Sequence, residues 1–139
     1  MTNIQFIFNI KDKWSILNNL LLKNLQKKKQ CLVYFENNED MELLSTNLWR
    51  HSKTNFLPHK INEACINEMI CLSNDKIDWM DATLINFSHS FINGFNRYIK
   101  LIELVTEDEK SRIGARERFK FYNDCGYKLS SYDSNDINF

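Results

Sequence analysis

Glycine and proline are scarce in this sequence, with three glycines and one proline among 139 residues. The glycines stand at positions 94, 114 and 126, so the chain has neither the G-x-G-x-x-G fingerprint of dinucleotide-binding folds nor a P-loop. The stretch 9–15, which follows the first apolar segment, contains no glycine that would let a backbone approach a pyrophosphate. These absences argue against a nucleotide cofactor.

A net charge of either sign is also lacking, because 18 Lys and Arg residues balance 18 Asp and Glu residues. Dedicated nucleic-acid-binding proteins carry a surplus of cations that neutralise phosphates, so we expect no direct nucleic-acid binding. No apolar run approaches the roughly 18 residues of a membrane span, and no basic-then-apolar signal segment opens the chain. With 43% hydrophobic residues, the sequence predicts a soluble cytoplasmic protein that has a packed core and no membrane contact.

Motifs for catalysis and metal binding are missing too. There is no G-x-S-x-G elbow and no C-x-x-C pair, and no known motif joins a histidine to a nucleophile. One conceivable set of metal ligands matches no zinc spacing, so we expect no metal. Its members are Cys65, Cys71, His51 and His59. A rival interpretation is a small metal-dependent α/β nuclease that uses Asp78 and Asp81, two carboxylates separated by two residues.

Apolar segments of two kinds alternate along the chain. Five are short and rich in β-branched residues, which predicts buried strands at 4–10, 31–35, 68–72, 82–87 and 98–105. Helical spacing predicts a helix from Asp12 to about residue 30, a short one over 41–49, and one over about 107–125. We interpret residues 50–60 as irregular, a final extended piece as beginning at Tyr127, and the tail 133–139 as frayed. The alternation predicts a single three-layer α/β domain over residues 1–139, with helices on both faces of a mostly parallel sheet.

The helix expected at 107–125 has the clearest boundaries. Thr106 and Glu109 form a T-x-x-E capping box, and Gly126 suits the residue that follows a helix end. At 100° per residue the helix has one core face, with Phe119 at its margin. The expected members of that face are Gly114, Ala115, Phe121, Tyr122 and Cys125. Arg118 points near this face, so we expect it to form a structural ion pair rather than a ligand contact.

Three cations recur beside that margin at i, i+4 and i+8, namely Arg112, Arg116 and Lys120. A cationic row next to an aromatic edge suits a peptide that carries carboxylates beside an apolar anchor. A guanidinium grips a carboxylate through two hydrogen bonds, and an adjacent apolar pocket accepts the anchor. The plainer interpretation is a solvated helix face, which spacing alone favours.

Large apolar residues also gather in the stretch that we expect to be irregular. Trp49 is followed by Phe56-Leu57-Pro58-His59. Such residues often cover a core, and where they are exposed they mark a protein–protein contact. The residues themselves leave both interpretations open.

Three segments together resemble the chi subunit of bacterial DNA polymerase III. They are Leu48-Trp49, Phe56-Leu57-Pro58-His59, and the run Ala115-Arg116-Glu117-Arg118-Phe119-Lys120-Phe121-Tyr122, which is followed by Gly126-Tyr127. The resemblance covers nearly the whole chain, with the elements in the same order. Its most specific part is the A-R-E-R-aromatic-K-x-Y run.

The resemblance implies a Rossmann-like sheet without a cofactor, and a non-catalytic accessory protein of the clamp-loader complex. It implies two partners, the psi subunit and the acidic carboxyl-terminal tail of single-stranded DNA-binding protein. Contact with psi would fall to Phe56, with Trp49 and Pro58 as neighbours. Such an adaptor reaches DNA through a coat protein, which agrees with a net charge of zero.

The resemblance also implies which residues hold the tail. Arg116 would be the main partner of the acidic groups of the tail, with Arg112 and Lys120 in support. Val105 and Phe119 would flank the pocket for its terminal aromatic residue.

Overall fold

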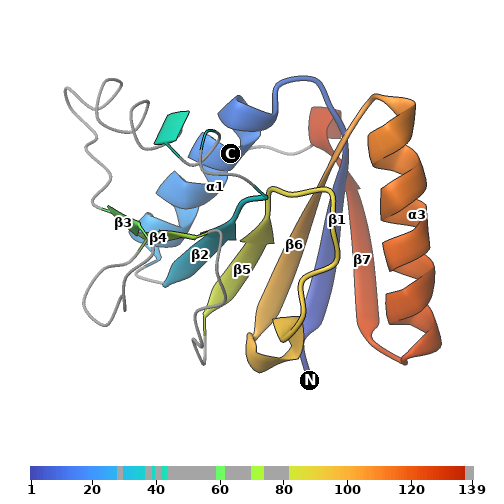
Figure 1. Ribbon diagram of the computed structural model, residues 1–139. Helices are drawn as coiled ribbons and strands as arrows, with labels where there is room; N and C mark the ends of the chain where they lie inside the picture. Colours follow the sequence, from blue (N-terminus) through green and yellow to red (C-terminus); the bar gives the residue numbers. More distant parts are fainter. Residues whose placement is uncertain are drawn as a thin grey trace.

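The computed structural model describes residues 1–27, 30–36, 39, 42–43, 59–61, 70–73 and 82–136. Its strands are β1 (Asn3–Ile10), β2 (Cys31–Tyr34), β3 (His59–Ile61), β4 (Ile70–Ser73), β5 (Thr83–Asn86), β6 (Lys100–Thr106) and β7 (Lys128–Asp133). Its helices are α1 (Lys13–Gln26) and α3 (Glu109–Asp124), with short 3-10 turns η1 (Phe95–Arg97) and η2 (Ser134–Asp136). The strands form one sheet in the order β3-β4-β2-β5-β6-β1-β7 (Figure 1), and every neighbouring pair is parallel.

The two faces of the sheet are covered by different helices, which makes three layers (Figure 1). On one face, Leu17 and Leu21 of α1 pack with one set of alternate strand residues. On the other face, Ala115 and Tyr122 of α3 pack with the intervening set. Strand side chains point alternately to the two sides, so this division places α1 and α3 on opposite faces. The predicted three-layer, Rossmann-like α/β fold is confirmed.

The helices begin close to the predicted positions, but one cap differs from the prediction. Asp12 caps α1 as expected, because its Oδ1 accepts the N–H of Trp14 at 3.1 Å. The cap of α3 is Asp108 and not the predicted Thr106. The Asp108 carboxylate accepts the N–H of Ser111 at 3.1 Å. Thr106 is still the last residue of β6. Among the described residues, no helix has the length and apolar character needed to cross a membrane.

The end of α3 was predicted correctly, but its buried face was not. Gly126 follows the helix with a φ of 84°, a left-handed conformation that glycine adopts without a Cβ clash. Phe121 is 47% exposed and Cys125 is exposed, although both were expected in the core. The buried residues of α3 are Ser111, Ala115, Arg118 and Tyr122. The helix is rotated so that Arg118 faces the sheet, where a buried acid meets it.

The remaining differences lie at the ends of the sheet. The strand β3 begins at His59, within the stretch 50–60 that was expected to be irregular, and it pairs with β4. At the carboxyl end, Asp133 completes β7 and Ser134–Asp136 forms η2, where fraying was expected from residue 133 onward. The Ser134 hydroxyl donates to the carbonyl of Asn9 at 2.7 Å, which ties this segment to β1. Most of the short helix expected at 41–49 lies outside the described residues.

Candidate functional site

A groove lies along the last part of β1 and β6, between these strands, β7 and the middle turns of α3. Its volume is about 370 Å³. The lining residues are Phe6, Phe8, Asn9, Val105, Arg112, Ala115, Arg116, Phe119 and Ser131. Parallel pairing of β1 with both β6 and β7 brings these distant segments together. Four of the five residues predicted to bind an acidic tail therefore line one groove.

The floor of this groove is apolar. Phe6, Val105 and Ala115 are buried, and all three side chains belong to the core on the α3 side of the sheet. Phe119 is 38% exposed and packs its ring against Phe6, with 5.3 Å between the ring centroids in an edge-to-face arrangement. The groove therefore offers partly exposed aromatic surface over a rigid apolar base, which is a suitable seat for an aromatic side chain.

The rim of the groove is basic. Arg112 and Arg116 are one helical turn apart, and both are exposed. The Nη2 of Arg112 donates to Oδ1 of Asn9 at 3.4 Å, so the hydrogen-bond partner of this guanidinium is a neutral amide. In the part of the chain that the structure describes, no hydrogen bond or ion pair engages Arg116. Lys120 is exposed on the next turn and does not line the groove.

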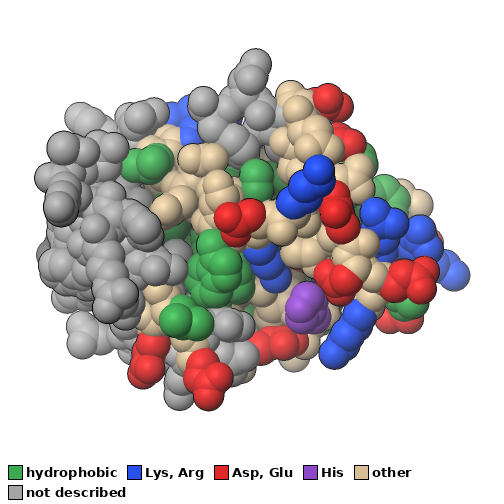
Figure 2. All heavy atoms as spheres, turned by 90° about the horizontal axis from the view of Figure 1, so that it is seen from above, with side chains coloured by type: hydrophobic (Ala, Val, Ile, Leu, Met, Phe, Trp, Pro, Cys, Tyr) green, Lys and Arg blue, Asp and Glu red, His purple; other side chains and the backbone are tan. Residues whose placement is uncertain are grey.

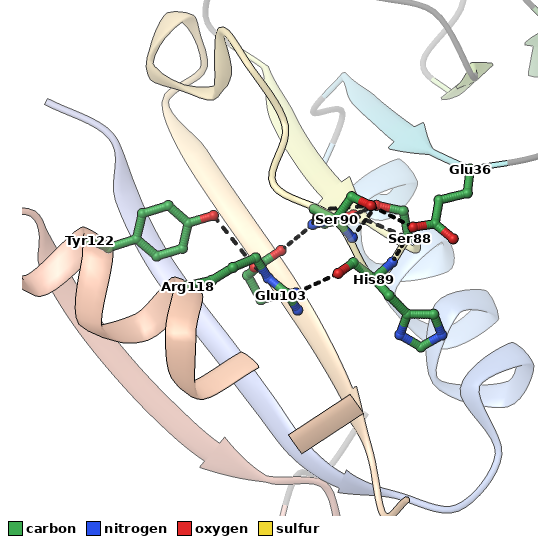
Figure 3. Close-up of polar contacts among 8 residues, drawn as sticks. Glu36, Ser88, His89, Ser90, Glu103, Arg118 and Tyr122 are labelled. Carbon is green, nitrogen blue, oxygen red and sulfur yellow. Dashed lines mark hydrogen bonds and ion pairs between the residues drawn. The ribbon is translucent and has the colours of Figure 1, made fainter. Parts of the chain in front are cut away.

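Arg118 lies two residues from Arg116 but has a structural role. Its Nε donates to the carboxylate of Glu103 at 2.5 Å, and its Nη1 donates to the carbonyl of His89 at 2.8 Å (Figure 3). Glu103 is fully buried in β6 and also accepts hydrogen bonds from Asn86 and Tyr122. Burial raises the pKa of Glu103, while Arg118 favours its ionised form. The predicted ion pair of Arg118 is confirmed.

This buried cluster extends to the loop that follows β5. Asn86 accepts the Ser88 N–H at 3.0 Å, and the Ser90 hydroxyl donates to Glu36 at 2.6 Å (Figure 3). The Ser90 hydrogen bond lowers the pKa of Glu36, whereas burial is the main cause that lowers the pKa of His89. Among the described residues, no buried polar side-chain atom of this cluster lacks a hydrogen-bond partner. The Arg118–Glu103 pair fixes α3 against the sheet. We assign it a positioning role for the helix that carries the groove's cations.

Charges of both signs occur on the edge of the sheet where the strands end. Figure 2 looks onto this edge and shows Lys and Arg side chains interspersed with Asp and Glu side chains. Among the described residues of this face, the mixture of signs differs from the single-sign field with which a nucleic-acid-binding face attracts phosphates. The basic rim of the groove is therefore a local feature of a neutral protein.

Several predicted residues lie outside the described part of the chain. They are the candidate psi contacts Trp49, Phe56 and Pro58, the candidate nuclease carboxylates Asp78 and Asp81, and the candidate metal ligands His51 and Cys65. The other two candidate metal ligands, His59 and Cys71, lie on the neighbouring strands β3 and β4. Within the described residues, no group of three or more His, Cys, Asp or Glu side chains is placed to hold a metal ion.

Comparison with solved structures agrees with the fold. The C-terminal domain of the DEAD-box protein Dbp5 superposes with a TM-score of 0.63 at 12% sequence identity, covering 98% of this chain and 92% of that one. At this identity the likeness concerns architecture only. No curated protein sequence matches the chain.

Comparison with protein families is more specific. The model of the family described as "DNA polymerase III chi subunit, HolC" matches residues 1–130 of the 139. The chain belongs to the chi family. This chi-family protein is thus an accessory subunit of DNA polymerase III, as its resemblance to chi implied.

Apart from Ala115, which was expected on the core face of its helix, sequence reasoning missed four residues that line the groove of this chi subunit. They are Phe6, Phe8, Asn9 and Ser131. Phe6 and Phe8 were assigned to a buried strand, yet Phe8 is 36% exposed at the groove. Asn9 is one of eighteen asparagines and belongs to no motif. Only the pairing of β1 with β6 and β7 reveals that these residues face α3.

Proposed function

We propose that this chi subunit is a non-catalytic adaptor whose groove binds the acidic carboxyl-terminal tail of single-stranded DNA-binding protein. The observation that carries the proposal is an apolar groove bordered by two exposed guanidinium groups. Arg112 contacts an amide there, and Arg116 has no partner among the described residues. Among the described residues neither cation is paired with an acid of its own chain, so both are available to an acidic ligand.

The groove matches the two kinds of group that such a tail presents. The apolar floor formed by Phe6, Val105 and Phe119 accepts the terminal aromatic ring, whose burial supplies most of the affinity. The carboxylates of the tail then lie at the rim, where Arg116 forms charge-assisted, two-point hydrogen bonds and Arg112 adds a second cation. Lys120, one turn further along α3, attracts the acidic residues that precede the tail's end.

We propose that a second surface, containing Phe56 with Trp49 and Pro58 beside it, binds the psi subunit. The support for this surface is the chi family match together with the large apolar residues that gather in this stretch of the sequence. With both surfaces occupied, the protein joins the clamp loader to template coated by single-stranded DNA-binding protein. It performs this role in the cytoplasm without a cofactor.

Replacement of Arg116 tests the tail site. Titration of a fluorescent acidic tail peptide into Arg116→Ala should show a loss of about 1.5–3 kcal/mol of binding free energy, the range for a lost charge-assisted hydrogen bond. Added salt should weaken binding to the wild-type protein, because the rim cations are exposed and therefore screened.

The matched control is Lys110→Ala. Lys110 is an exposed cation on the same helix that does not line the groove, so this variant changes the net charge equally. We expect it to bind the peptide as the wild type does. Equal affinities of the wild type and Arg116→Ala would refute the assignment of Arg116.

A further inference from the structure

Asn9 has an unusual backbone conformation at the end of β1. Its φ is 59°, and it is the one described non-glycine residue with a positive φ. The pairing of β1 with β6 shifts register between Ile7 and Ile10, so Asn9 lies in a β-bulge. Asparagine tolerates this left-handed region better than most residues do. The bulge turns the Asn9 side chain toward the groove, which it helps to line.

The side chain and carbonyl of Asn9 are held from the carboxyl end of the chain. Its Nδ2 donates to the carboxylate of Asp133 at 2.9 Å, and its carbonyl accepts the Ser134 hydroxyl at 2.7 Å. Because Nδ2 is engaged by Asp133, Oδ1 is left pointing to α3, where it accepts a hydrogen bond from Arg112. Three segments far apart in the sequence thus meet at one amide.

We propose that Asn9 is a positioning residue that orients the Arg112 guanidinium over the groove. The inference rests on the proposed tail-binding function and adds a residue that supports it indirectly. A free arginine side chain samples many rotamers, and a hydrogen bond to a fixed acceptor restricts them before the ligand arrives. The Asp133 and Ser134 contacts hold that acceptor in place, so the segment η2 belongs to the binding site's framework.

The arrangement also explains why a neutral amide stands at this position. An aspartate at residue 9 would neutralise Arg112 and repel Asp133, whereas the amide satisfies both neighbours without removing positive charge from the rim. Arg112 therefore keeps its attraction for carboxylates while its direction is fixed.

A double-mutant cycle with Asn9→Gly and Arg112→Ala tests the proposal. Glycine accepts the positive φ, so Asn9→Gly removes the side chain without straining the bulge. We expect Asn9→Gly to weaken binding of the tail peptide by about three- to tenfold, and to cause no further loss when Arg112 is already alanine. Ser134→Ala, which loosens the clamp on Asn9, should weaken binding in the same direction. Equal losses from Asn9→Gly in both backgrounds, or no loss at all, would overturn the proposal.

A measurement without peptide separates this inference from the proposed function. NMR relaxation of the Arg112 Nε–Hε group should show increased motion in Asn9→Gly, whereas the Arg118 Nε–Hε group, held by Glu103, should be unchanged. If the Arg112 signal responds but neither the wild type nor any variant binds the tail peptide, the proposed function is wrong, and the orientation of Arg112 by Asn9 is still supported. If the peptide binds and the Arg112 signal does not respond, the positioning role is wrong. Thermal unfolding of each variant confirms that the fold is retained.

Discussion

At the scale of single residues, two arginines separated by one position on α3 have opposite environments. Arg116 is exposed at the groove, while Arg118 is 7% exposed and paired with a fully buried glutamate. The two side chains are about 200° apart around a helix, which places one at the rim and the other against the sheet. The sequence indicated this difference through angular position alone.

Removing Arg118 should therefore affect stability strongly. In Arg118→Ala, the Glu103 carboxylate stays buried without its counter-charge, and we expect the free energy of unfolding to fall by about 3–5 kcal/mol. Urea denaturation followed by circular dichroism measures the change. Arg116→Ala serves as the comparison, and its exposed position predicts a change within about 0.5 kcal/mol. Equal stabilities of the two variants would contradict the structural role of Arg118.

At the same scale, sequence reasoning placed correctly the residues whose position depends on local spacing. Arg112 and Arg116 recur one helical turn apart, so their shared face could be predicted. The role of Asn9 could not be predicted, because it depends on a bulge and on contacts with residues more than 100 positions away. The exposure of Phe121 was also missed, since the buried Arg118–Glu103 pair sets the rotation of α3.

At the scale of elements, the start of α3 depends on a compact set of side-chain bonds. Asp108 accepts the N–H of Ser111, and the Ser111 hydroxyl in turn accepts the N–H of Thr106. The Thr106 hydroxyl donates to Asp108. These bonds resemble a capping box shifted by two residues from the predicted one, and they link the end of β6 to the helix.

The cap predicts a pH dependence of stability. The Thr106 hydrogen bond, followed by that of the Ser111 N–H, lowers the pKa of Asp108 in the folded state. A lowered carboxyl pKa adds stability that is complete above the unfolded pKa, about 3.9, and is lost as pH falls through the folded pKa. Asp108→Asn keeps a good cap but does not titrate.

The comparison of Asp108→Asn with the wild type isolates this contribution. The stability advantage of the wild type should be constant near neutral pH and should shrink as the pH falls below about 4. Urea unfolding midpoints measured from pH 7 to pH 3 provide the test. An advantage that persists unchanged at pH 3 would show that Asp108 does not titrate with a lowered pKa.

Elements were predictable where the local signal is strong. The strands β1, β2, β5 and β6 are apolar on both faces, as expected for central strands of a parallel sheet. The strand β3 was missed because three residues carry no recognisable alternation. The segment η2 was expected to fray because its residues are polar, but the Ser134 hydroxyl ties it to the carbonyl of Asn9.

At the scale of the whole molecule, the alternation of strands and helices sufficed to predict three layers, but not the groove. The groove exists because β7 extends the sheet beyond β1 and lies next to α3 (Figure 1), while Phe119 of α3 reaches Phe6 of β1. The proposed adaptor function needs two separate surfaces that work at the same time. We propose the groove as one of them and the psi contact as the other.

A bridging assay tests the two surfaces together. Psi is immobilised on beads, the chi protein is added, and retention of a labelled single-stranded oligonucleotide is measured with and without single-stranded DNA-binding protein. We expect retention only when all components are present, because the neutral chi chain lacks the excess cations that hold naked phosphates.

Two variants separate the surfaces. Phe56→Ala should not be captured by psi, so no oligonucleotide should be retained. Arg116→Ala should still be captured by psi but should not retain the coated oligonucleotide. Phe56→Ala should still bind the free tail peptide with wild-type affinity, since we propose Phe56 for the psi surface and not for the tail site. Loss of both psi capture and tail-peptide binding in Phe56→Ala would indicate unfolding. Retention of naked oligonucleotide would contradict the proposal that chi reaches DNA through its coat protein.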